Sequence, residues 1–70
     1  MSAVEKIQAF LSAEAGRAYC DDCLSKLLKV KPRQQVQQKT SVLAHNRAYR
    51  RERSVCKFCK REKLVIRRAA

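Results

Sequence analysis

Four cysteines carry the clearest chemistry in this chain of 70 residues. They form two C-x-x-C pairs, Cys20 with Cys23 and Cys56 with Cys59, separated by 32 residues, and no cysteine is left over. Thiolates are preferred zinc ligands in closed tetrahedral sites, and each C-x-x-C loop supplies two of them. The spacing therefore predicts one structural Zn²⁺ per chain, with four protein ligands and no position open for a substrate.

Three other uses of the cysteines stay open at this point. Two disulfides would suit an exported protein, a C-x-x-C pair occurs in thioredoxin-like redox centres, and four thiolates can hold an iron–sulfur cluster. Residues 1–10 are amphipathic and lack the apolar segment of a secretory signal, which favours a reducing, cytoplasmic compartment and a metal. The chain is short for a thioredoxin-like framework. The residues around Cys56 and Cys59 are basic, as in a zinc knuckle, which favours zinc over an iron–sulfur cluster.

The charge of the chain predicts a polyanionic partner. The formal net charge is +11, and residues 47–70 hold ten of the 17 Lys and Arg residues beside only two acidic ones. Such a balance attracts nucleic acid first, and anionic membranes or acidic proteins second. No run of about 18 apolar residues is present, so a membrane span is not expected.

The sequence predicts three helices, at residues 2–15, 20–30 and 32–46. The second of them would carry the first cysteine pair. Ser2 followed by Glu5 fits a capping box, and Gly16 suits the end of the first helix. Cys20 and Cys23 would share the first turn of the second helix, where residues three apart are neighbours. Pro32 is typical of the first residue of a helix and would begin the third.

A β-hairpin at residues 52–67 would position the second cysteine pair. Val55 belongs to its expected first strand and residues 64–66, which include two β-branched residues, to its second. The predicted fold is thus one α+β domain over residues 1–70, mainly α, in which zinc joins the second helix to the hairpin. A chain this short often depends on such a metal for stability.

The segment CLSKLLKVKPRQQVQQKTSVLA, which covers the second and third helices and the turn between them, resembles a helix-turn-helix. Together with the first helix and the hairpin, the chain resembles a small zinc-stabilised winged-helix DNA-binding domain over nearly its whole length. The cysteines depart from ordinary winged helices. The resemblance implies that the third helix enters the DNA major groove and that the hairpin acts as a wing.

The candidate nucleic-acid contacts lie on the third helix and the hairpin. Gln suits adenine and Arg suits guanine, whereas Lys and Arg on the hairpin would bind phosphates without reading sequence. The candidates are Arg33, Gln34, Gln37, Gln38 and Ser41 on the helix, and Arg50, Arg51, Arg53, Lys57, Lys60, Arg61 and Lys63 on the hairpin. A solvated helix face, and basic residues that serve only solubility and compensation of the zinc thiolates, are the simpler interpretations.

The sequence favours a small DNA-binding transcription regulator in the cytoplasm, associated with the nucleoid. An RNA- or ribosome-binding zinc protein and a protein-interaction adapter with a basic surface are the alternatives. An enzyme is not expected, because the committed cysteines leave a single histidine and no convincing pair of carboxylates. A homodimer would suit a small protein that reads paired half-sites.

Overall fold

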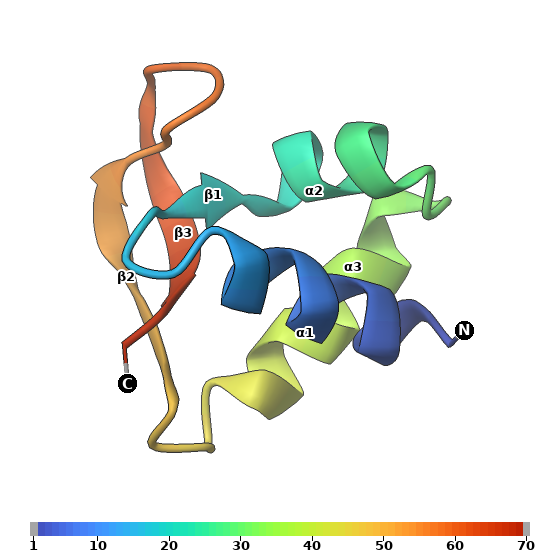
Figure 1. Cartoon of the computed structure of the whole chain (residues 1–70). Helices are drawn as coiled ribbons and strands as arrows, with labels where there is room; N and C mark the ends of the chain where they lie inside the picture. Colours follow the sequence, from blue (N-terminus) through green and yellow to red (C-terminus); the bar gives the residue numbers. More distant parts are fainter. Residues whose placement is uncertain (1, 70) are drawn as a thin grey trace.

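The computed structural model describes residues 2–69, which form three helices and three strands. Their order is α1 (Ala3–Ala13), β1 (Tyr19–Cys20), α2 (Asp21–Leu28), α3 (Arg33–Leu43), β2 (Tyr49–Val55) and β3 (Glu62–Arg68). The three helices pack together on one side of the sheet (Figure 1). The mixed α+β class expected from the sequence is confirmed. Among the described residues, no helix has the length and apolar character needed to cross a membrane.

The sheet is antiparallel, with β3 in the centre and β1 and β2 at its edges. The pairing of β2 with β3 runs from Tyr49 opposite Arg68 to Val55 opposite Glu62, so the strands reach beyond the expected range 52–67. Residues 56–61 join these two strands. The strand β1 was not predicted, because two residues are too few to show an alternating pattern. Its pairing with β3 fixes Cys20 against the sheet.

The helix limits differ from the expected ranges for local reasons. The second helix begins at Asp21 rather than residue 20, because Cys20 is extended and belongs to β1. It ends at Leu28, since Lys29 adopts a left-handed conformation with φ of 55°. The third helix spans 33–43 instead of 32–46, with Pro32 as its N-cap.

The first helix shows one confirmed signal and one correction. Ser2 and Glu5 form the expected capping box, in which each side chain accepts a hydrogen bond from the other residue's backbone N–H. The helix ends at Ala13 rather than residue 15, with Glu14 as its C-cap. Gly16 has φ of +84°, as a turn glycine would, but lies beyond the helix end.

The left-handed conformation of Lys29 gives a first testable prediction. Replacement of Lys29 by glycine should stabilise the protein by about 0.5–1 kcal/mol, because glycine adopts positive φ without steric cost at a helix C-terminus. A urea unfolding curve followed by circular dichroism would measure the change. The matched control is Lys26→Gly, which removes the same charge from inside α2 and should destabilise by about 1 kcal/mol. A lower unfolding midpoint for Lys29→Gly would contradict the prediction.

The core lies between the helices and the sheet. The helix α3 turns Val36, Thr40 and Leu43 inward and leaves Val42 exposed. Leu27 on α2 is partly exposed. The fully buried side chains outside α3 are Ile7, Leu11, Cys20, Leu24, Cys56, Val65 and Ile66. Cysteines from both pairs therefore belong to the same buried core.

A buried ion pair ties the sheet to two helices. Arg51 on β2 donates from both terminal nitrogens to Asp21 at the start of α2, at 2.8 and 3.1 Å, and from Nη1 to the Thr40 hydroxyl at 2.6 Å. The Thr40 hydroxyl in turn donates to Asp21 at 2.9 Å. The Arg51 and Asp21 side chains are 10% and 4% exposed. The guanidinium group of Arg51, a predicted phosphate contact, is thus engaged by Asp21 and Thr40.

Candidate metal centre and nucleic-acid interface

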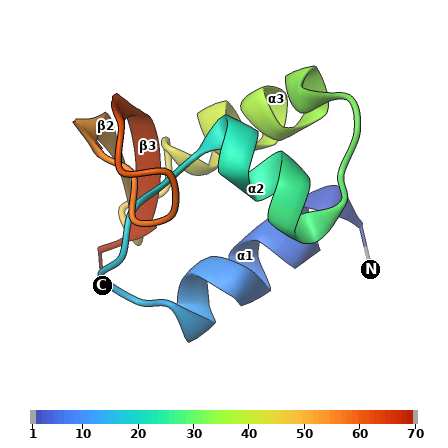
Figure 2. The same cartoon turned by 90° about the horizontal axis from the view of Figure 1, so that it is seen from above.

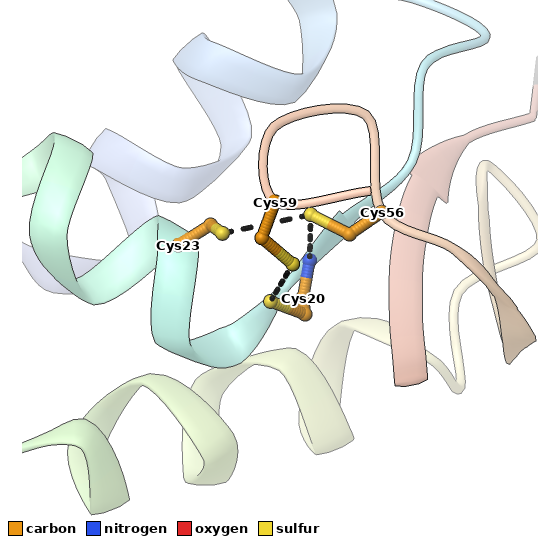
Figure 3. Close-up of side chains that lie close together, drawn as sticks. All are labelled: Cys20, Cys23, Cys56 and Cys59. Atoms are coloured by element: carbon orange, nitrogen blue, oxygen red, sulfur yellow. Dashed lines mark hydrogen bonds between the residues drawn. The ribbon is translucent and has the colours of Figure 1, made fainter. Parts of the chain in front are cut away.

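The four cysteine sulfurs converge on one point between the sheet, α2 and the loop 56–61 (Figure 3). All four Sγ atoms lie within 4.8 Å of one another. Cys20 comes from the end of β1 and Cys23 from the first turn of α2, while Cys56 and Cys59 come from the loop. The sequence prediction that the two pairs form one cluster is confirmed.

The sulfur positions fit a single tetrahedral ion. Zinc–sulfur bonds of about 2.3 Å place the corners of a tetrahedron about 3.8 Å apart. The Cys20–Cys59 and Cys23–Cys56 sulfur distances are 3.9 and 3.6 Å, and each joins one pair to the other. All four cysteines are free thiols, so the disulfide alternative is not what the structure shows. An iron–sulfur cluster divides its four thiolates among two or more iron atoms, whereas these four surround one position.

Backbone hydrogen bonds hold the loop in the shape that presents its two sulfurs. The Cys56 N–H donates to the Arg61 carbonyl at 2.9 Å, and the Lys60 N–H donates to the Cys56 carbonyl at 3.0 Å. Lys60 adopts φ of 65°, which lets the chain turn back into β3 after Cys59. The Lys57 N–H donates to the Ala18 carbonyl at 2.7 Å and fastens the loop to the segment before β1.

The electrostatic environment distinguishes the thiols. Burial opposes ionisation of Cys56, but the backbone N–H groups of Cys59, Cys20 and Phe58 outweigh it and lower the Cys56 pKa to about 6. The Cys20 N–H lies 3.4 Å from that sulfur. Burial raises the pKa of Cys20 and Cys23, so their thiols hold their protons more tightly. An incoming metal ion would meet a ready thiolate at Cys56 and displace protons from the others.

A groove lies between α3 and the β2–β3 strands, with a volume of about 310 Å³. It brings together five of the predicted nucleic-acid contacts, Arg33 and Gln37 from the helix and Arg51, Arg53 and Lys63 from the strands. Gln34, Gln38 and Ser41 are also exposed along α3. The groove therefore joins residues that suit base reading to residues that suit phosphate binding.

Asp22 lies among the cations of this groove. Its carboxylate forms ion pairs with Arg33 and, at 2.9 Å, with Lys63. The hydrogen bond from Lys63, helped by the charge of Arg33, lowers the Asp22 pKa against the opposing effect of burial. The sequence did not reveal this cluster, because nothing in the linear pattern shows that Lys63, 41 positions later, folds beside Asp22.

The remaining predicted contacts lie elsewhere. Lys57 and Lys60 line a second hollow of about 400 Å³, together with Glu52, Ser54, Val65 and Arg67. Glu52 and Ser54 alternate along β2 with Arg51 and Arg53 of the groove, so neighbouring residues of one strand line two different hollows. Arg50 pairs with Glu52 at 3.0 Å, and Arg61 is exposed in the loop. The basic residues therefore form two surfaces rather than the one expected.

Similarity to other proteins adds no constraint to this picture. No family model, curated protein or solved structure matches this chain. The function must be inferred from the metal centre, the groove and the distribution of charge.

Proposed function

We propose that this chain is a zinc-stabilised winged-helix protein that binds duplex DNA and acts as a small transcription regulator. In this proposal α3 is the recognition helix and the strands β2–β3 are the wing, which the loop 56–61 closes at the end beside the cysteines. The order helix, strand, helix, helix, strand, strand supports it, as does the antiparallel pairing of β2 with β3 beside α3. Zinc is the proposed metal because four thiolates in two C-x-x-C pairs surround one tetrahedral position.

The groove between α3 and the wing is the observation that carries the proposal. It places Gln37, whose amide can pair with adenine N6 and N7, beside Arg53, whose exposed guanidinium forms no ion pair within residues 2–69. A recognition helix needs such neighbours, because phosphate contacts fix the orientation in which base contacts can form. A net charge of +11 adds the general attraction to a duplex.

The zinc would be structural in this protein. Cys20, Cys23 and Cys56 are buried and Cys59 is half-buried, and four thiolates leave no coordination position for a substrate. The ion would join the start of α2 to the tip of the wing. It would thereby hold the wing at a fixed angle to the helix pair α2–α3 that carries the proposed base-reading residues.

A parallel selection from random DNA duplexes and a random RNA pool, with zinc-loaded protein, tests this proposal. Enrichment of a duplex motif is expected, with log affinity falling by roughly 0.9 per phosphate contact for each unit of log salt. A preference for RNA would contradict duplex DNA binding and would favour an RNA- or ribosome-binding protein. Failure to bind either pool would favour an adapter that meets an acidic protein.

Gln37 is expected to contribute sequence preference. Replacement of Gln37 by alanine should weaken binding to the selected duplex by about 1–3 kcal/mol and leave binding to unrelated duplexes nearly unchanged. Fluorescence anisotropy with both duplexes would measure the difference. Gln35→Ala is the matched control, because Gln35 is exposed on the same helix but does not line the groove. Equal losses on both duplexes would show that Gln37 contributes affinity without reading a base.

Asp22 is expected to weaken DNA binding in the native protein. Its carboxylate occupies Arg33 and Lys63, and it repels phosphates that approach them. Replacement by asparagine should therefore raise duplex affinity several-fold and steepen the salt dependence. Glu14→Gln removes one negative charge from the end of α1, away from the groove, and should change affinity less. Unchanged or lower affinity for Asp22→Asn, at full zinc occupancy, would contradict the prediction.

A further inference from the structure

The loop 56–61 displays an aromatic ring surrounded by unpaired cations. The side chain of Phe58 is 57% exposed. Lys57, Lys60 and Arg61 are exposed as well, and within residues 2–69 none of the three forms an ion pair with a carboxylate. We name these four residues the knuckle surface. Phe58 is not needed for the core, because Cys56 and its neighbours in the sheet fill the interior below the loop.

The knuckle surface lies apart from the proposed duplex-binding groove. Lys57 and Lys60 line the second hollow, and none of the four knuckle residues lines the groove. Figure 2 shows α3 and β2 along one edge of the molecule and the loop 56–61 turned from that edge toward α1 and α2. A duplex seated on α3 would therefore leave this surface accessible.

The loop is held rigidly enough to present the ring in a fixed place. The Lys57 and Lys60 N–H groups donate to the carbonyls of Ala18 and Cys56, at 2.7 and 3.0 Å. The Phe58 N–H is directed at the Cys56 sulfur, which is itself part of the metal centre. An ordered aromatic loses little conformational freedom when a ligand stacks on it, so the fixed backbone favours binding through Phe58.

We propose that the knuckle surface binds single-stranded nucleic acid, with one unpaired base stacked on the Phe58 ring and the neighbouring phosphates against Lys57, Lys60 and Arg61. Aromatic rings beside cations are the general means by which proteins hold single strands, since every base has a face that stacks. The adjacent hollow of about 400 Å³ gives the next nucleotide room, with a Ser54 hydroxyl and an Arg67 guanidinium in its lining.

The chemistry of the surface favours a single strand over other polyanions. In a duplex the base faces are already stacked, so one exposed ring gains a partner only from an unpaired base. An acidic peptide would use the cations but would leave the ring without its stacking partner.

The test uses the full zinc-loaded chain and a labelled dT12 oligonucleotide. The native chain contains no tryptophan, so Phe58→Trp creates a single fluorescent reporter at the proposed contact. We expect dT12 to quench its emission and to bind at least as tightly as it binds the native protein. Phe58→Ala should weaken dT12 binding about five- to 150-fold, the range that loss of one stacked base produces. Circular dichroism and zinc content would confirm that each variant is folded.

Two controls separate this site from the proposed duplex site. Val42→Ala removes an exposed apolar side chain from α3 and should leave dT12 binding unchanged. Phe58→Ala should leave affinity for the selected duplex nearly unchanged. Absence of dT12 binding by the native protein, or equal dT12 binding by Phe58→Ala, would overturn the inference while leaving the duplex proposal standing. Stronger quenching of Phe58→Trp by a twelve-residue polyglutamate than by dT12 would also overturn it, in favour of an acidic protein partner.

Discussion

Replacement of Cys56 by serine is expected to destabilise this protein by on the order of 5 kcal/mol, which is most of the stability of a small domain. Cys56 is completely buried, and its sulfur accepts a hydrogen bond from the Cys20 N–H while lying 3.6 Å from Cys23. A serine hydroxyl is a poor zinc ligand, so three thiolates would remain around the ion. The variant should lose zinc affinity and tertiary structure together, as measured by metal analysis and by urea unfolding.

Metal chelation supplies the matched control for Cys56→Ser. Removal of zinc from the native protein should lower its unfolding midpoint to about that of the variant, and the variant itself should respond little to the chelator. Duplex affinity should fall in parallel, because the same ion would hold the wing tip against α2. A Cys56→Ser protein with one zinc per chain and native stability would show that the ion does not hold the end of the wing against α2. If the native protein bound iron in place of zinc, the identity of the metal would change, but its proposed structural role would remain.

The cysteine spacing predicted the cluster of four sulfurs well because each C-x-x-C pair is a local arrangement. Two cysteines separated by two residues lie close together whatever the remainder of the chain does. All four cysteines belong to such pairs, and a small chain offers few roles for four thiols other than binding one metal ion. The capping box of Ser2 and Glu5 was predictable for the same reason. The inward positions of α3 were predictable because helical periodicity depends only on near neighbours.

The features that the sequence did not reveal depend on distant pairing. The strand β1 exists because Tyr19 and Cys20 pair with Ile66 and Val65, more than forty positions along the chain. The strand β2 begins at Tyr49 although the segment after it is rich in arginine, since its partners in β3 supply the hydrogen bonds. Asp21 and Arg51 are 30 positions apart, and neither carries a local sign of burial. Hydrophobic periodicity and residue propensities describe near neighbours in the sequence. They cannot show such contacts, because the contacts depend on the register in which distant strands pair.

The division of the basic residues has the same origin. Alternate residues of a strand point to opposite faces, so a run of arginines and lysines that is continuous in the sequence is separated in space. Arg53 lines the groove beside α3, whereas Lys57 and Lys60 line the second hollow. Asp22 and Glu52 each hold two cations, which leaves fewer charges for a ligand than the net charge suggests. Two moderately charged surfaces fit two contacts with nucleic acid better than one broad footprint does.

Asp21→Asn is the second substitution with a large expected effect, a loss of about 3–5 kcal/mol. Asparagine keeps the size of the side chain but leaves the Arg51 guanidinium buried beside Thr40 without a counter-charge. Breaking one partner of a buried ion pair costs far more than the pair contributes, because the remaining charge stays desolvated. Urea unfolding at saturating zinc would measure the loss, and saturation separates it from any change at the neighbouring Cys20.

The adjacent aspartate provides the matched control. Asp22→Asn removes the same charge one residue along the chain, but the Asp22 side chain is 38% exposed and its ion pairs face the groove. Its effect on stability should stay below about 1 kcal/mol. The double variant Asp21→Leu with Arg51→Met should recover most of the stability lost in Asp21→Asn, because it removes both buried charges at once. Equal destabilisation by the two single asparagine variants would mean that the Asp21–Arg51 pair is solvated, and that packing alone joins β2 to α2 and α3.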